Sequence, residues 1–296
     1  MNRPSDLAGI TAMLAATAVF VVGDSFMKLV TEDLQPFETL LLRSIAASLA
    51  CAVLITLRGE WRVISGVFNG RAILRACGET LCTLCYVVAL ARMQIADVIA
   101  ILQTTPLLVM LGAALLLRER IGLVRGALAL VGFAGALMVA QPGTSGVPPA
   151  ALLAFGAATL GAIRDLAGRS VPHRIPVMVI NFATMLMMIV AAGGMSLVLE
   201  TWTVPSGRHL GFLSLAGLLL TLGHGALLLA FRLGRTGSIA PFFYSFALWG
   251  VTAGLVVWGT LPNALALFGI TLIVGSGIAI VLAGQNREKA GSADAL

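Results

Sequence analysis

The chain has 296 residues, of which 59% are hydrophobic and 11% are charged, and its mean hydropathy is +1.00. Soluble domains carry roughly 25% charged residues, so this composition excludes a soluble globular fold. The net charge of +6 is spread over short loops instead of gathered on one domain, which argues against a nucleic-acid binder. The apolar residues form runs of about 20, the length of a helix that crosses a hydrocarbon core of roughly 30 Å.

Ten apolar runs follow one another along the chain, separated by charged or Pro/Gly-rich breaks. In lipid each run must be a helix, because every backbone N–H and C=O needs a partner within its own segment. The first run begins at Leu7 without a clear cleavage site, so we expect it to be retained as a span. We therefore predict an all-α polytopic membrane protein with ten transmembrane helices, at residues 7–30, 36–57, 72–91, 95–117, 121–140, 148–168, 175–198, 209–231, 237–258 and 262–283.

The basic residues predict how these helices are oriented, since cytoplasmic loops carry an excess of Lys and Arg. With the N-terminus inside, most of the 19 Lys and Arg residues fall on the cytoplasmic side. The opposite loops are acidic at 31–36 and neutral at 141–149 and 259–263. We expect a multi-pass protein of the cell inner (plasma) membrane with both termini in the cytoplasm.

The two halves of the chain also resemble each other. A shift of 141 residues places Asp24 on Asp165, and Lys28 on Arg169. Five spans in each half is an odd number, so the second half is inverted relative to the first, a common architecture of secondary transporters. We predict one repeat at 1–142, a second at 143–284, and a short cytoplasmic tail at 285–296.

The stretch Ala96–Gly143 begins with small residues at the start of the fourth predicted span, followed by a proline within that span and a Glu at its inner end. A Gly-rich fifth span comes next. With Gly23, Lys28 and Arg43 in the first two spans, and the sequence SFALWG at 245–250, this stretch resembles the drug/metabolite transporter superfamily in its ten-helix EamA-type branch. The resemblance implies transport of amino acids, purines, sugars or other metabolites, often outward. Amino acid export is the best single expectation from it.

Ionisable side chains within the spans are costly in lipid and need a partner or a wet cavity. Near the outer ends, Asp24 and Arg43 lie at similar depth and could pair, with Lys28 one turn beyond Asp24. Such groups either fix helix packing or gate access from the two sides of the membrane. The candidate gating residues are Asp24, Lys28, Arg43, Arg164, Asp165 and Arg169, the last three near the cytoplasmic ends.

A solute site is expected near the midplane between the repeats. The 141-residue shift pairs Gln103 and Thr104 in the fourth span with Tyr244 and Ser245 in the ninth, and Pro106 and Pro241 interrupt the same spans. These four polar residues could bind a ligand or only bond to their own helices. The other candidate substrate-binding residues are Tyr86 and Trp249 as apolar walls, Glu79, and His224, which either couples transport to protons or bonds to a neighbouring helix.

The leading interpretation is a secondary carrier of a small amphipathic metabolite, since no nucleotide-binding motif is present. A nucleoside-like, sugar or cationic cargo, a channel and an intramembrane enzyme are the alternatives; we expect no enzyme, because no H-E-x-x-H or G-x-S-x-G motif occurs. Cys77, Cys82 and Cys85 lie on one apolar helix, so neither a cofactor nor a metal is expected. The expected partners are the solute and the lipid bilayer, with a homodimer possible through the Gly-rich fifth and tenth spans.

Overall fold

A computed structural model describes residues 6–116, 123–141, 147–168, 171–172, 174–233 and 239–293. In this part of the chain the regular elements are helices, and no strand occurs. Seven of these helices are long and apolar enough to cross a membrane. They are α1 (Asp6–Val30), α2 (Pro36–Arg58), α3 (Gly70–Arg92), α7 (Pro149–Gly168), α8 (Val177–Leu199), α9 (Gly207–Leu233) and α12 (Ala264–Ala293).

The remaining elements are shorter. They are the 3-10 helices η1 (Glu60–Phe68) and η2 (Ala240–Tyr244), and the helices α4 (Ile95–Leu102), α5 (Thr105–Leu116), α6 (Leu123–Ala140) and α11 (Ser245–Trp258). Three apolar helical stretches of 10–17 residues lie at Ile95–Val109, Gly126–Ala140 and Phe242–Trp258, where the sequence predicts the fourth, fifth and ninth spans. The all-helical membrane fold is therefore confirmed, and the count of ten spans stays a prediction.

The predicted fourth and ninth spans are both interrupted. The fourth breaks between α4 and α5 at Gln103 and Thr104, and the ninth changes from η2 to α11 between Tyr244 and Ser245. These two positions are related by the 141-residue shift. Pro106 lies in the first turn of α5, where its missing N–H costs no intrahelical bond, which explains why a new helix begins there.

Two other boundaries differ from the sequence prediction. Helix α12 continues to Ala293 and so includes residues that the sequence assigns to a tail. The segment between the predicted second and third spans, for which the sequence analysis predicts no element, forms η1. Several of its apolar side chains, including Trp61 and Phe68, are exposed.

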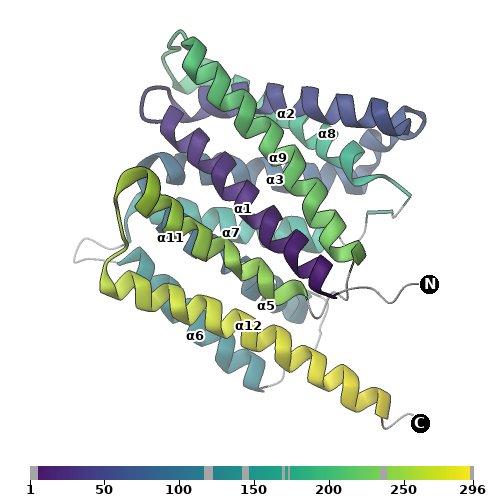
Figure 1. Cartoon of the computed structure of the whole chain (residues 1–296), viewed down its shortest axis with the longest axis vertical. Coiled ribbons are helices and arrows are strands. Elements are labelled where there is room, and N and C mark those ends of the chain that lie inside the picture. The colour runs from purple at the N-terminus through teal and green to yellow at the C-terminus, as the bar shows by residue number, and fades with distance from the viewer. Residues whose placement is uncertain are drawn as a thin grey trace.

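The helices pack in pairs that join the two halves of the chain. Helix α1 lies along α9, α3 along α7, α2 along α8, and α6 along α12 (Figure 1). The α6–α12 contact is close enough that a Cβ on Gly135 would lie 2.6 Å from the carbonyl oxygen of Gly269. The Gly-rich fifth and tenth predicted spans thus serve as a packing surface within one chain.

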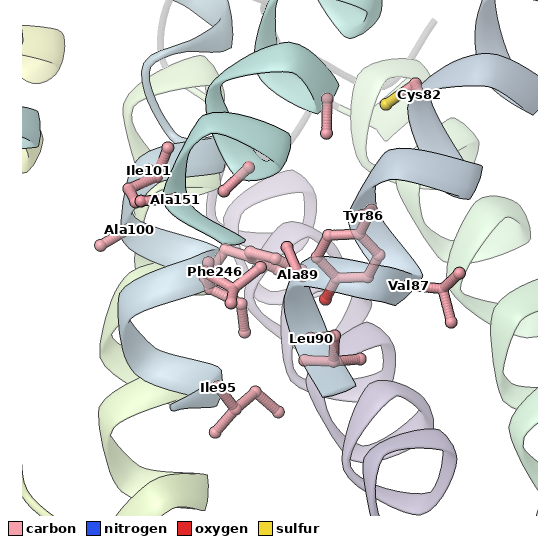
Figure 2. Packing of buried hydrophobic residues seen from close by; sticks show 14 of the residues in the cluster. Cys82, Tyr86, Val87, Ala89, Leu90, Ile95, Ala100, Ile101, Ala151 and Phe246 are labelled. Atoms are coloured by element: carbon pink, nitrogen blue, oxygen red, sulfur yellow. The ribbon is translucent and has the colours of Figure 1, made fainter. Parts of the chain in front are cut away.

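The largest apolar core lies between α3, α4, α7 and α11. Figure 2 shows side chains of this cluster, among them Leu90, Ile101, Ala151 and Phe246. Many members are alanines, which allow the helices to approach closely without a hydrophobic driving force from water. Tyr86 lies within the same cluster and brings a hydroxyl into it.

The loops that the sequence places outside the membrane converge at one end of the helix bundle. Trp258 Nε1 donates to Glu32 at 2.6 Å, His209 Nε2 lies 3.1 Å from Asp33, and the side chains of Gln141 and Asn263 bond to each other. The start of α1 and the end of α12 lie at the opposite end (Figure 1). The relative sidedness therefore agrees with the prediction, whereas the assignment of one end to the cytoplasm stays a prediction.

Candidate functional site

A cluster of three buried polar side chains occupies the interior near the predicted outer end. The Asp24 carboxylate of α1 accepts a hydrogen bond of 2.8 Å from the Tyr86 hydroxyl of α3 and lies 3.5 Å from Arg43 Nη1 of α2. All three residues are at most 9% exposed. Asp24 and Arg43, which the sequence places at similar depth, contact each other, while their gating role stays a prediction. Tyr86, expected as an apolar wall, donates a hydrogen bond to Asp24.

Lys28 does not join this cluster. Its Nζ donates to the carbonyl oxygens of Leu90 and Met93 at 2.6 and 2.7 Å, and it lies 5.7 Å from the ring centroid of Trp258. A cation at the C-terminal end of a helix satisfies free carbonyls and interacts favourably with the helix dipole. Lys28 thus holds α1 to the end of α3 at the outer end of the bundle.

A second polar cluster lies nearer the predicted cytoplasmic end. Arg164 of α7 donates from Nη1 to Glu79 at 2.6 Å and from Nε to Asp165 at 2.8 Å. His224 of α9 makes a local bond, with Nδ1 2.8 Å from the Leu220 carbonyl oxygen, and its ring meets Phe20 edge-on. Arg169, the third candidate gating residue near the cytoplasmic ends, lies outside the described residues.

Between these two clusters is a small polar cavity bounded by α2, α3, α8 and α9. Its volume of about 40 Å³ admits only a few water molecules and is too small for an organic solute. A larger hollow of about 350 Å³ opens at the surface beside η1, around the exposed Arg62 and Phe68, and is not within the bundle. The interior cavity is lined by Arg43, Arg75, Glu79, Thr83, Asn181, Thr184, Met185, Met188, Leu220 and His224.

The walls of this cavity come from matching positions of the two halves. Arg43 and Thr184 differ by 141 residues, as do Glu79 and Leu220, and Thr83 and His224. The same shift relates the two interrupted helices. The cavity therefore lies between segments that the predicted repeat treats as equivalent.

None of the four polar residues at the helix breaks lines this cavity; Gln103, Thr104 and Tyr244 are buried, and Ser245 is partly buried. Gln103 Nε2 donates to the Phe243 carbonyl oxygen at 3.3 Å, and the Ser245 hydroxyl shares a hydrogen bond of 2.8 Å with Thr17. Thr104 bonds to its own helix, and Tyr244 is 3% exposed. Their contact with a ligand stays a prediction.

Of the other predicted site residues, Glu79 and His224 line the cavity, together with the predicted gate residue Arg43. Trp249 lies partly buried in the core, away from it. Asn181, Thr83 and Thr184 were not singled out from the sequence. Thr184 carries a usable signal, because it is the 141-residue partner of Arg43, whereas a lone Asn or Thr in an apolar run carries none.

Comparison with known proteins gives the family. Residues 7–141 match the EamA-like transporter family. A riboflavin transporter of Rhizobium johnstonii is 31% identical over 225 residues, which cover 74% of this chain and 71% of that protein. The chain belongs to the EamA-like transporter family. Membership confirms the resemblance and makes the protein a multi-pass membrane transporter.

Other members and structures agree with this assignment. A pseudopaline exporter of Pseudomonas aeruginosa is 28% identical over 280 residues, which cover 92% of this chain and 95% of that exporter. One solved structure superposes with a TM-score of 0.66 over 93% of this chain and 98% of that chain, at 18% identity, which shows a shared fold. These two relatives are named for chemically different cargoes, so the similarity indicates transport without identifying the solute.

Proposed function

We propose that this EamA-like protein is a secondary carrier that moves a small polar metabolite by alternating access around the interior cavity. The observation that carries the proposal is the pairing of cavity positions by the 141-residue shift. When a site lies between equivalent segments of two inverted halves, rocking one half against the other in one direction opens the site to one side of the membrane. Rocking it in the opposite direction opens the site to the other side.

Residues 1–142 and 143–284 are the two proposed repeats, and the helix pairs support them. The 141-residue shift matches α1 with α7, α2 with α8, and α3 with α9. If the halves are equivalent, the α1–α9 contact should have a counterpart in α7–α3, and the α2–α9 contact a counterpart in α8–α3. All four contacts occur. The same shift relates two close approaches. A Cβ on Gly23 would lie 3.4 Å from Leu219 Cβ, and a Cβ on Gly78 would lie 3.1 Å from Arg164 Cβ. The shift relates these two contacts, because positions 23 and 164 are 141 residues apart, and so are positions 78 and 219.

The two polar clusters are proposed to close the cavity on opposite sides. Asp24 and Arg43 join α1 to α2 on the predicted outer side, and Glu79 and Arg164 join α3 to α7 on the inner side. The outward-open state requires the outer ion pair to separate, and the inward-open state requires the inner ion pair to separate. Ion pairs whose charges stay partly solvated by the cavity can separate at lower cost than pairs enclosed in lipid.

Two cargo classes are proposed. The resemblance to the drug/metabolite transporter superfamily, from which amino acid export is the best single expectation, favours amino acids. The similarity to a riboflavin transporter favours a flavin, a planar ring with polar edges. Both are small amphipathic molecules, and the cavity wall combines charged and hydroxyl side chains with Met185, Met188 and Leu220.

Uptake into proteoliposomes tests the proposal. Labelled riboflavin and a panel of labelled amino acids are offered to the wild type and to empty vesicles, with and without a pH gradient. Saturable uptake supports a carrier, and flux that rises linearly with concentration indicates a channel. Thr184→Val should weaken uptake because Thr184 lines the cavity, whereas Gln103→Ala should weaken it only if the helix breaks bind the solute.

A further inference from the structure

Two side chains in the cavity wall carry hydrogen-bond donors with no partner among the described residues. They are Arg43 Nε on α2 and Asn181 Nδ2 on α8, and both residues are almost completely buried, at 5% and 6% exposure. Both line the interior cavity. Because an unpaired donor in a low-dielectric interior is costly, two donors at one cavity indicate a partner supplied from outside the chain.

Arg43 is held in place without using all of its donors. The Asp24 carboxylate lies 3.5 Å from Nη1 and is itself held by the Tyr86 hydroxyl at 2.8 Å. This arrangement balances the guanidinium charge and fixes its position. A guanidinium carries five N–H donors in a planar fork, so Nε is left to bind something else.

The other charged groups of the wall do not compete for these donors. Glu79 is engaged by Arg164 at 2.6 Å, so its carboxylate is already paired. Arg75 adds a further positive charge, and Met185 and Met188 add apolar surface. The wall therefore combines free hydrogen-bond donors and positive charge with an apolar patch. This combination is complementary to a molecule that carries hydrogen-bond-accepting oxygens on one edge, here called an oxygen edge, and is otherwise apolar.

We infer that the cargo is recognised through an oxygen edge, a carboxylate or the carbonyl edge of a ring imide, which accepts hydrogen bonds from Arg43 Nε and Asn181 Nδ2. This inference rests on the proposed carrier function, because the cavity must widen beyond about 40 Å³ to admit such a molecule. The two donors come from different repeats, so a bound oxygen edge bridges the halves that move. Arg43 and Asn181 are then specificity-determining residues.

The test uses the full chain in proteoliposomes with two labelled probes, riboflavin for the ring imide and L-phenylalanine for the carboxylate. Arg43→Lys keeps a charge beside Asp24 but removes Nε, and Asn181→Leu removes Nδ2 at similar volume. Ser44→Ala is the matched control, since Ser44 lies beside Arg43 and its hydroxyl bonds to Leu40 of its own helix at 2.7 Å. The KM of the transported probe should rise at least about tenfold in both variants and stay unchanged in the control.

The two sources of the oxygen edge give different results. If the carboxylate is bound, L-phenylalaninamide should fail to compete with L-phenylalanine, and riboflavin uptake should be absent or insensitive to Asn181→Leu. If the ring imide is bound, riboflavin uptake is the activity that the two variants weaken. Unchanged KM values for every transported probe in both variants would overturn the inference.

Stability without ligand separates binding from structure. Because Asn181 Nδ2 has no partner among the described residues, Asn181→Leu should leave the melting temperature Tm unchanged or raise it. A lower Tm would mean that Asn181 supports the fold, and would overturn the inference. If the wild type takes up neither probe, the riboflavin and amino acid cargoes of the proposed function fail. The Tm of Asn181→Leu still decides whether this donor is free: an unchanged or raised Tm supports the inference, and a lower Tm rejects it.

Discussion

Asp24 is the residue on which the outer polar cluster depends. It is the only carboxylate described within ion-pair distance of Arg43, and it also accepts the Tyr86 hydroxyl. Removing one partner of a buried pair leaves the other charge uncompensated, which costs more than the pair itself contributes. The cluster therefore behaves as a unit in which each member positions the next.

Neutralising this carboxylate should destabilise the protein. Asp24→Asn can still accept from Tyr86 but cannot balance Arg43, so we expect a loss of roughly 3 kcal/mol, measured as a lower Tm in detergent. Tyr86→Phe removes one hydrogen bond and should cost about half as much. An Asp24→Asn protein as stable as Tyr86→Phe would show that the Arg43 charge is balanced elsewhere.

At the scale of the helices, close approach at small residues determines which surfaces meet. Gly217 of α9 faces the backbone of α2, and a Cβ there would lie 2.7 Å from the Ala47 nitrogen and 2.8 Å from the Arg43 carbonyl oxygen. Backbone atoms cannot rotate away as a side chain can. The crossing of α2 and α9 beside the cavity thus requires glycine at this position.

Gly217→Ala should separate α9 from α2 and lower stability by about 1–3 kcal/mol. Gly211→Ala is the control in the same helix, because a Cβ there would meet nothing within 4 Å and alanine favours a helix over glycine by roughly 1 kcal/mol. Thermal unfolding of the two variants should shift in opposite directions. Equal shifts would indicate that the crossing adjusts without strain.

At the scale of the whole molecule, the outer end is closed by contacts between the two halves. The N-cap residue of α2, Gln35, makes no side-chain capping bond, and Glu200 from the second half accepts from Phe37 N at 2.8 Å and Glu38 N at 2.9 Å instead. Glu38 in turn accepts from Thr203 N at 3.2 Å. A carboxylate at a helix N-terminus is favoured by the helix dipole, so this reciprocal contact stabilises the closed outer end.

Loss of this contact should open the cavity to the outside. In a protein whose native cysteines are replaced, Thr184→Cys places a thiol in the cavity wall. Adding Glu200→Ala should raise the rate at which a membrane-impermeant thiol reagent modifies that cysteine from the outer side. Thr201→Ala, an exposed neighbour, should leave the rate unchanged. Equal rates for the two variants would show that the outer closure does not depend on Glu200.

The sequence alone determined the membrane fold, the approximate span positions and the family, because each follows from local properties. Length and hydropathy of a run decide whether it can cross lipid, and proline decides where a helix restarts, as at Pro106. The pairing of Asp24 with Arg43 was also predictable, since an ionisable side chain deep in a span needs an opposite charge at its own depth.

Only the tertiary structure decided which polar residues share a cavity. Gln103 and Tyr244 are buried and are related by the 141-residue shift, yet they do not line the cavity, whereas Asn181 and Thr184 do. Helix α8 makes about six turns, and apolar residues occur on all of its faces, so its sequence does not tell which face meets the opposite half. That choice depends on crossings such as Gly217 against α2, and these exist only once all the helices are packed.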